Sequence, residues 1–316
     1  MSTAVTISGD FPSAASGVAM SETPGLSMRQ TMADLVELTK PRIVVMILVT
    51  TGVSALFAAG GPLSASLAMH LLIGTALVAA SAGTLNQFLE REVDGRMTRT
   101  ARRPLPAGRI APSVALGYGI LLVFLGSLYL FQYVNPITSL LGIVTWLSYL
   151  AIYTPLKQRT SFNTTVGAIA GAVPMLMGYT GGGGSLMDVA GWLLLGVLVA
   201  WQYPHFMAIA WLYRHQYGEA GFKMTPTVEP TGRSAGRQAI AGAILLPMLL
   251  CFLVAPLERN WLWIPILIIV SLPLIRSSLA FAADPQDATA RRMLRASLSQ
   301  LPLSMLVLVF ATFFGH

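Results

Sequence analysis

An amide and two carboxylic acids, Asn86, Glu90 and Asp94, recur every four residues at the end of a long apolar run. In a helix, side chains at i, i+4 and i+8 lie along one face, so their oxygen atoms can meet a single ligand. Mg²⁺ binds a few carboxylate oxygens and completes its coordination with water or phosphate. The spacing therefore predicts a metal and diphosphate site with these three residues as candidate catalytic and metal-binding residues.

Six arginines lie within residues 91–109, around and directly after the acidic stripe. Arginine offers paired N–H donors to phosphate oxygens. If the helix continues beyond the stripe, Arg99 and Arg103 share a face and point at the same anion. Two alternatives stay open: a solvated helix end whose charges pair with one another, and a basic loop that obeys the positive-inside rule, our interpretation for Arg102 and Arg109.

Three further residues are candidates for ligand binding. Lys157 follows an apolar run, where it serves equally well as an interfacial anchor or as a cation for diphosphate. Arg214 belongs to a second polar segment and is another candidate for diphosphate. His205 lies inside an apolar run and is either a packing residue or a ligand of a metal-bearing cofactor such as haem, since neutral imidazole is a common axial ligand.

The composition excludes a soluble globular protein. Of the 316 residues, 54% are hydrophobic and only 10% are charged, and the mean hydropathy is +0.67. Nine apolar runs each approach the roughly 20 residues that a helical membrane crossing needs. The prediction is an all-α polytopic membrane protein with nine transmembrane helices, at residues 42–60, 67–89, 113–132, 136–153, 163–180, 189–210, 238–256, 261–280 and 297–314.

The positive charges predict an orientation. If the N-terminus is cytoplasmic, all but one (Arg259) of the 20 Lys and Arg residues fall on the inner side, as the positive-inside rule requires. This rule explains the net charge of +7 better than nucleic-acid binding, because no basic stripe runs along a soluble surface. The polar loops 86–112 and 205–237 are separated by four crossings and must share this side, as in two parallel repeats.

The N-terminal residues 1–37 are rich in small and polar residues and are predicted to form a disordered cytoplasmic tail, without the pattern of a signal or transit peptide. Lys40-Pro41-Arg42 marks the membrane boundary, since proline suits the first helical turn and the two cations suit the interface. In the fifth run, Gly167, Gly171 and Gly178 are expected to allow close helix packing.

Five motifs together resemble those of the intramembrane (UbiA-type) prenyltransferases, and within that superfamily the members that farnesylate haem. The resemblance extends from Thr39 to the last apolar run. Its motifs are Asn86-x3-Glu90-x3-Asp94, Met97-x-Arg99-Thr100-x2-Arg103-Pro104-Leu105, Tyr153-Thr154-Pro155-Leu156-Lys157, Asn163-x3-Gly167-Ala168 and Trp201-Gln202-x-Pro204-His205-Phe206.

The resemblance implies one intramembrane prenyltransferase domain, residues 38–316, with nine helices around a central cavity in a bacterial inner membrane and its active site toward the cytoplasm. It implies Mg²⁺-dependent loss of diphosphate from farnesyl diphosphate, capture of the farnesyl group by a vinyl group of haem b, and addition of water. Diphosphate would be bound by Arg99, Arg103, Lys157 and Arg214, and haem by His205. The expected partners are these two substrates, the lipid bilayer and a downstream haem-modifying enzyme.

Two positions depart from the family's pattern. Glu90 stands where Asp is frequent; its side chain is one methylene longer, and its carboxylate can still bind Mg²⁺. Gln216 stands where an Asp is common in the second polar segment, so that one metal cluster suffices, Glu219 contributes, or turnover is reduced. Two other functions remain open: prenylation of an aromatic or quinone precursor, and secondary transport, although a transporter usually holds its ionisable site near the bilayer midplane rather than at helix ends.

Overall fold

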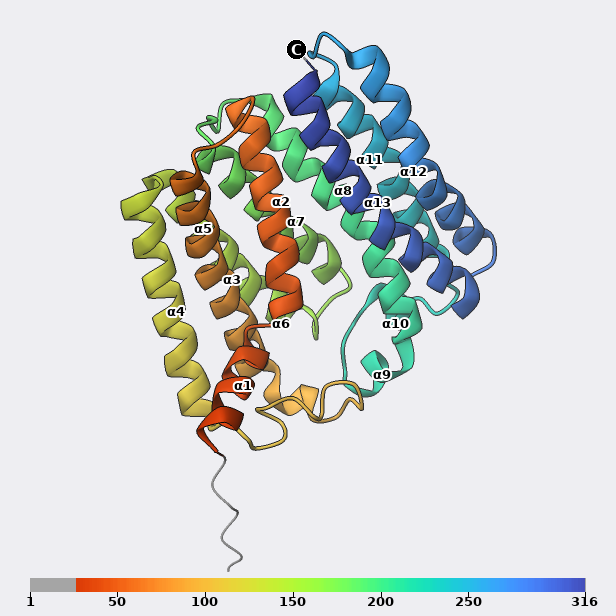
Figure 1. Cartoon of the computed structure of the whole chain (residues 1–316). Coiled ribbons are helices and arrows are strands. Elements are labelled where there is room, and N and C mark those ends of the chain that lie inside the picture. Colours follow the sequence, from red (N-terminus) through yellow and green to blue (C-terminus); the bar gives the residue numbers. More distant parts are fainter. Residues whose placement is uncertain (1–26, 316) are drawn as a thin grey trace, which may run out of the picture.

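The computed structural model describes residues 27–315, and every regular element within them is helical (Figure 1). Each predicted apolar run forms a helix, so the all-α prediction is confirmed. The elements are α1 (Met28–Leu38), α2 (Pro41–Ala59), α3 (Ala65–Asp94), α4 (Pro112–Tyr133), α5 (Pro136–Leu147), the π-helix η1 (Ser148–Tyr153), α6 (Thr154–Leu156), α7 (Asn163–Gly181), α8 (Val189–Leu212), α9 (Arg214–Glu219), α10 (Thr225–Val228), α11 (Arg233–Val254), α12 (Asn260–Ala283) and α13 (Asp287–Phe314).

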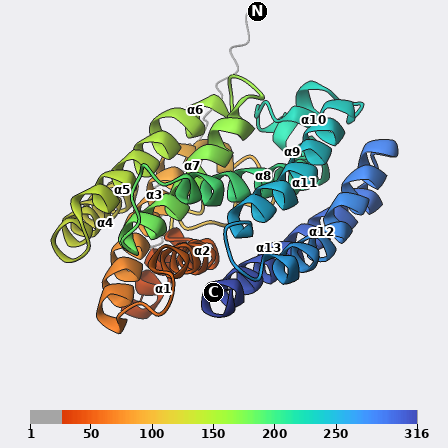
Figure 2. The ribbon, with the colours of Figure 1, turned by 90° about the horizontal axis from the view of Figure 1, so that it is seen from above.

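The long helices form one continuous bundle. Successive helices pack side by side, α3 on α4 and α11 on α12, and α7 joins the two halves because it contacts both α2 and α8. The last helix, α13, packs on α8 and returns to α2, as the view from above shows (Figure 2). The chain thus places its first and last long helices side by side.

Eight helices of the described part of the chain are long and apolar enough to cross a membrane: α2, α3, α4, the continuous segment Pro136–Leu156, α8, α11, α12 and α13. The fifth predicted crossing, α7, is not among them. Its glycines, alanines and threonines are mostly buried between α2, α5 and α8, so this helix needs few large apolar side chains. The count of nine crossings therefore stays a prediction.

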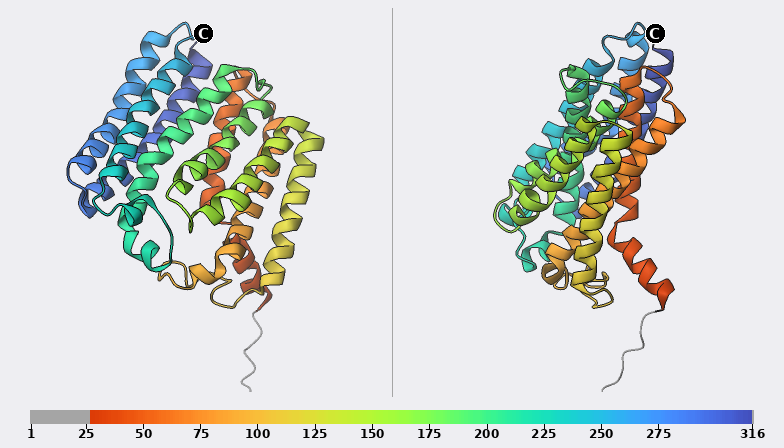
Figure 3. Two further views of the ribbon diagram at one scale, coloured as in Figure 1. Left: turned by 180° about the vertical axis from the view of Figure 1, so that it is seen from behind. Right: turned by 90° about the vertical axis from the view of Figure 1, so that its left-hand side faces the viewer.

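The outer surface of the bundle suits lipid rather than water. Large apolar side chains of α4 lie more than half exposed, among them Ile120, Leu121 and Phe124. A continuous surface of this kind is typical of a face that another apolar phase covers. The start of α1 and the end of α13 lie at opposite ends of the bundle (Figures 1 and 3), as an odd number of crossings requires.

One end of the bundle, at the bottom of Figure 1, collects the polar connections. It holds α1, the segment 95–111, α9 and α10, and is called the polar end below. The two polar loops that were predicted to share a side do meet there: Met97, from the first loop, packs against Ala220 and Phe222 of the second. The prediction that these two loops lie on the same side of the bundle is therefore confirmed.

Several helix ends differ from the prediction. Residues 28–38, expected within a disordered tail, form α1, whose first turn carries a capping box between Ser27 and Gln30; residues 1–26 of the predicted tail lie outside the described residues. Helix α13 begins at Asp287, about three turns before the predicted residue 297. The extra turns are polar and escape a hydropathy criterion, but alanine, arginine and leucine sustain a helix there.

The glycines of α7 do permit close packing. A Cβ atom on Gly178 would overlap the carbonyl oxygen of Thr51 in α2, and one on Gly167 would press into the ring of Tyr153. Thr51 also donates a hydrogen bond to the carbonyl oxygen of Pro174, and Ser54 donates one to that of Met175. The two backbones therefore approach closely at Gly178, and hydroxyl groups of α2 bond to the backbone of α7.

Replacing Gly178 by alanine is expected to destabilise the protein by about 1–3 kcal/mol, as overpacking of a tight core does. The thermal unfolding midpoint in detergent measures this. Gly117→Ala in α4 is the matched control, because a Cβ there meets no atom within 4 Å. Equal midpoints for the two variants would contradict the packing argument.

Candidate active site

The last turns of α3 carry the acidic stripe into the interior of the polar end. Asn86, Glu90 and Asp94 are only 1%, 7% and 1% exposed. These three residues are therefore not a solvated helix end. Their burial leaves two carboxylates that need compensation, because an unpaired charge is costly away from water.

Each member of the stripe is bonded to a basic side chain from a different part of the chain. Lys157 Nζ lies 2.7 Å from Glu90 Oε1, and Arg103 NH1 lies 2.6 Å from Asp94 Oδ2. Lys40 Nζ donates to Asn86 Oδ1 at 2.6 Å. These residues are called the acid–base cluster below: Lys40, Asn86, Glu90, Asp94, Arg103 and Lys157.

Lys40 enters the cluster through an unusual turn between α1 and α2. It has φ +55°, the one positive φ of a non-glycine residue within residues 27–315, a conformation that costs about 1–3 kcal/mol. The turn is held in place because Gln87 donates to the carbonyl oxygen of Leu38 at 3.0 Å. Arg109 holds α1 through an ion pair with Asp34, with 2.9 Å between Nε and Oδ1.

The electrostatics of Lys40 follow from this position. Burial of its ammonium group, with the nearby Arg103 and Lys157 charges, lowers the pKa of Lys40 to about 7. Glu90 and Asp94 act in the opposite direction but do not outweigh burial. Lys40 therefore loses its proton far more readily than an ordinary lysine.

Lys157 is positioned by the π-helix η1, which interrupts the helix at Ser148–Tyr153. Such π turns are frequent at functional sites. Thr154 accepts a hydrogen bond from Asn86 Nδ2 at 3.1 Å, and the Tyr153 ring lies 4.6 Å from the Lys157 ammonium group. Burial acts to lower the pKa of Lys157, but Tyr153 and Glu90 outweigh it, and the pKa lies above its ordinary value.

Arg99 and Arg103 do not share a helical face, because α3 ends at Asp94. The chain turns there, and Thr100 Oγ1 donates to the backbone oxygen of Asp94 at 2.8 Å. This turn brings Arg103 back to the Asp94 carboxylate. Arg99 instead stacks on Tyr213, with 4.7 Å between the guanidinium carbon and the ring centre, and contacts Tyr217 Oη at 3.3 Å.

The second polar segment covers the cluster without adding a carboxylate to it. The backbone N–H of Lys223 donates to the carbonyl oxygen of Lys157 at 2.7 Å, and Phe222 is buried near the same lysine. Arg214 is bound to Asp287 at 2.8 Å and lies outside the cluster. Glu219 is exposed, so a diphosphate role for Arg214 and a metal role for Glu219 stay predictions.

His205 lies in α8 and faces α13, apart from the contacts of the acid–base cluster. Its Nδ1 atom is 2.9 Å from Ser297 Oγ, and its ring stacks on Trp201 at 4.6 Å between centres. Two residues before it, Tyr203 points away from it, about 200° around the helix, where its hydroxyl donates to Thr165 Oγ1 at 2.9 Å.

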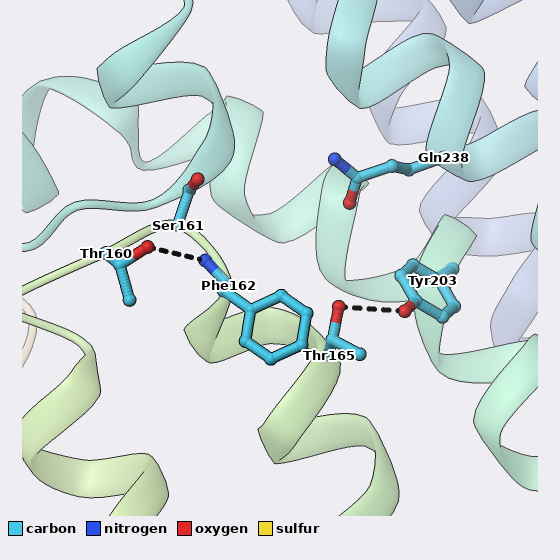
Figure 4. Close-up of a pocket in the computed structure, with 6 residues that line it drawn as sticks. All are labelled: Thr160, Ser161, Phe162, Thr165, Tyr203 and Gln238. Atoms are coloured by element: carbon cyan, nitrogen blue, oxygen red, sulfur yellow. Dashed lines mark hydrogen bonds between the residues drawn. The ribbon is translucent and has the colours of Figure 1, made fainter.

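Tyr203 lines a pocket of about 270 Å³ between α7, α8 and α11 (Figure 4). The other lining residues are Thr160, Ser161, Phe162, Thr165 and Gln238. The pocket is open and carries no charged side chain, so it lacks the groups that hold a diphosphate or a metal ion.

The donor set of the acid–base cluster fits Mg²⁺ together with a diphosphate. Within residues 27–315, Glu90 Oε2 and Asp94 Oδ1 make no hydrogen bond, so each carboxylate retains an oxygen for a metal ion. No group of three or more His, Cys, Asp or Glu side chains is assembled in that part of the chain. Asn86 Oδ1 accepts from Lys40 and keeps a second lone pair, so two carboxylates and this amide oxygen suit a metal ion that takes its other ligands from phosphate.

The fold and this site define a class: a helical membrane protein with a buried set of acids and cations at one end of its bundle. The chain belongs to the UbiA prenyltransferase family, whose pattern matches residues 47–301. It is 50% identical over 283 residues to the protoheme IX farnesyltransferase of Rhodopirellula baltica, and the alignment covers 87% of this chain and 98% of that relative.

Solved structures agree on the fold. A digeranylgeranylglyceryl phosphate synthase superimposes with a TM-score of 0.71 at 14% identity, over 89% of this chain and 98% of that one. A UbiA homolog from Archaeoglobus fulgidus, bound to DMAPP and Mg²⁺, superimposes with a TM-score of 0.62 at 17% identity, over 87% and 99%.

Sequence reasoning missed Lys40 and Thr154 as members of the site. Lys40 was interpreted only as a membrane-boundary residue, and its left-handed turn has no sequence signal, since glycine or asparagine usually takes that conformation. Proline at the first position of α2 did signal that a helix begins directly after Lys40.

Lys40 predicts a pH dependence of stability. Its folded pKa of about 7 lies below the ordinary 10.5, so between these values the unfolded chain binds a proton that the folded chain has lost. The free energy of unfolding therefore rises as the pH increases through this window. We expect Lys40→Met to lose much of that rise, measured by denaturant unfolding in detergent. Arg42→Met, which removes an exposed neighbouring charge, is the control, and equal slopes in Lys40→Met and the parent would refute the assignment.

Proposed function

We propose that this protein transfers the farnesyl group of farnesyl diphosphate to a vinyl group of haem b, with addition of water, giving haem O and diphosphate. The observation that carries the proposal is the buried acid–base cluster, in which Asn86, Glu90 and Asp94 each bond to a separate cation. The 50% identity to a protoheme IX farnesyltransferase supports this choice of substrates, and a prenyl diphosphate with Mg²⁺ bound to a homolog of the same fold supports metal dependence.

The reaction breaks the bond between farnesyl C1 and the diphosphate oxygen, and the diphosphate leaves with the electron pair. Farnesyl C1 bonds to the terminal vinyl carbon, and the resulting cation next to the porphyrin ring takes up water, which releases a proton. Mg²⁺ bound by Asn86, Glu90 and Asp94 would neutralise charge on the departing diphosphate.

The chain's own cations serve the same leaving group. When Lys40 is protonated, Lys40, Arg103 and Lys157 outnumber the two carboxylates of the cluster, and a bound polyanion favours that protonated form. Their ammonium and guanidinium groups are already fixed by Asn86, Glu90 and Asp94, and donors fixed before the reaction stabilise developing charge most effectively. Arg99, held against Tyr213 and Tyr217, would bind the outer edge of the diphosphate.

The apolar interior serves the other parts of the substrates. The farnesyl chain suits the apolar bundle, which keeps water from the carbocation. The ring of Tyr153, already beside Lys157, offers a π face to a cation. His205 in α8 is the proposed haem contact, since its imidazole lies between α8 and α13 and can bind the iron of haem through a ring nitrogen.

The proposed location is a bacterial inner membrane with the polar end in the cytoplasm. The distribution of Lys and Arg supports this orientation. Farnesyl diphosphate would then place its charged head at the polar end and its tail in the bundle. The product is a haem that a later haem-modifying enzyme would consume.

The proposal is tested with the purified protein in detergent, supplied with haem b, farnesyl diphosphate and Mg²⁺. Mass spectrometry should detect a product heavier than haem b by one farnesyl group and one hydroxyl group, and a metal chelator should abolish it. Prenylation of a quinone precursor without any haem product would overturn the proposal.

Asp94→Asn is expected to reduce product formation on the order of 100-fold or more, since a metal ion contributes several kcal/mol of charge stabilisation. The variant should remain folded, because Arg103 is partly exposed and can turn to water. Glu92→Gln is the matched control, as Glu92 lies in the same helix with an exposed side chain. Near-normal turnover by Asp94→Asn would remove Asp94 from the metal site.

A further inference from the structure

The imidazole of His205 is held from two sides, by Ser297 and by Trp201. Ser297 Oγ, in α13, lies 2.9 Å from His205 Nδ1. Trp201, one helical turn before His205, stacks on the imidazole with 21° between the ring planes. The indole Nε1 of Trp201 donates to the backbone oxygen of Ser297 at 2.8 Å. One residue of α13 thus fixes both rings of α8.

The hydrogen bonds of Ser297 determine which imidazole nitrogen carries the proton. Ser297 Oγ is also 2.7 Å from the carbonyl oxygen of Leu294. A carbonyl oxygen can only accept, and two oxygens this close require a proton between them. The single hydroxyl proton of Ser297 is therefore donated to Leu294. Ser297 Oγ must then accept from His205, so the proton of the neutral imidazole lies on Nδ1.

The other nitrogen, Nε2, consequently presents a lone pair. The neighbours of the ring, Trp201, Phe206 and Ser297, are all uncharged, and none of them carries the negative charge that would pair with an imidazolium ion. Within residues 27–315, Nε2 makes no hydrogen bond, and it is not fully enclosed by the surrounding side chains. A neutral imidazole with an accessible Nε2 lone pair and a bonded Nδ1–H is the form that binds metal ions.

We infer that Ser297 and Trp201 are positioning residues that hold His205 as an axial ligand for the iron of haem through Nε2. This rests on the proposed function, because haem b is its acceptor substrate. Ser297 selects the tautomer and strengthens the ligand by accepting the Nδ1 proton. Trp201 fixes the plane of the ring, which in turn fixes the macrocycle relative to α8.

The test is a titration of the purified protein in detergent with ferric haem b, followed by the Soret absorption band. Ser297→Ala should weaken haem binding about 10–100-fold, as loss of a bonded partner of a metal-ligating histidine does, and should shift the band away from that of a histidine-ligated haem. Ser297→Thr retains the hydroxyl and should keep both properties. Trp201→Phe keeps a stacked ring without the indole N–H and should have a smaller effect than Ser297→Ala.

Two controls separate ligation from packing. Ser271→Ala removes a fully buried hydroxyl that donates only within its own helix, to the carbonyl oxygen of Leu267, and should leave haem binding unchanged. Metal-free protoporphyrin IX has the same ring without iron, so Ser297→Ala should not change its affinity, measured by porphyrin fluorescence. In a His205→Ala background, which lacks the ligand, Ser297→Ala should have no further effect on haem affinity.

The inference is overturned if Ser297→Ala binds ferric haem b with the parental affinity and Soret band, or if it weakens haem and protoporphyrin IX equally. In either case, normal farnesyl transfer by the parent protein would leave the proposed function standing. If the parent protein neither binds haem b nor converts it, the proposed function fails together with the inference.

Discussion

Two carboxylates buried at the end of a membrane helix constrain everything around them. Glu90 and Asp94 are almost fully enclosed, and a buried carboxylate is tolerated only when a charged partner is close. The partners cannot come from α3 itself, whose face is occupied by the acids. They come from the turn after α3, through Arg103, and from the segment after α6, through Lys157. The fold of the polar end follows from the need to bring these separate segments together.

The cluster is poorly explained as a device for stability. Buried ion pairs often contribute little net free energy, because desolvation offsets their attraction. Lys40 adds a third cation in a strained backbone conformation, with a lowered pKa of about 7. Such features persist where a ligand supplies the missing compensation. In the proposed function a metal-bound diphosphate would supply it, since its negative charge would favour protonated Lys40 while the metal ion would bind the free oxygens of Glu90 and Asp94.

The sequence predicted the helices of the bundle and the acidic stripe because both depend on local periodicity. It did not predict which cations reach the stripe, since that depends on turns. Arg99 and Arg103 were expected to share a face only if the helix continued; α3 ends at Asp94 instead, and the turn at Thr100 returns only Arg103 to the acids. Residues 28–38 were wrongly assigned to a disordered tail, because they form α1 in contact with a distant segment, through the ion pair of Asp34 with Arg109 and the packing of Leu38 on Leu105 and Ile110.

One helix connects the proposed haem contact with the cover of the acid–base cluster. α8 carries His205 and continues directly into the segment whose Tyr213 and Tyr217 hold Arg99 and whose Lys223 bonds to the backbone of Lys157. A displacement of α8 would therefore move the haem contact and the cover of the acid–base cluster in the same direction. Since a small misplacement of reacting atoms can slow a reaction strongly, a single rigid helix is an effective way to fix haem relative to diphosphate. The packing of α8 against α7, α11 and α13 supplies that rigidity.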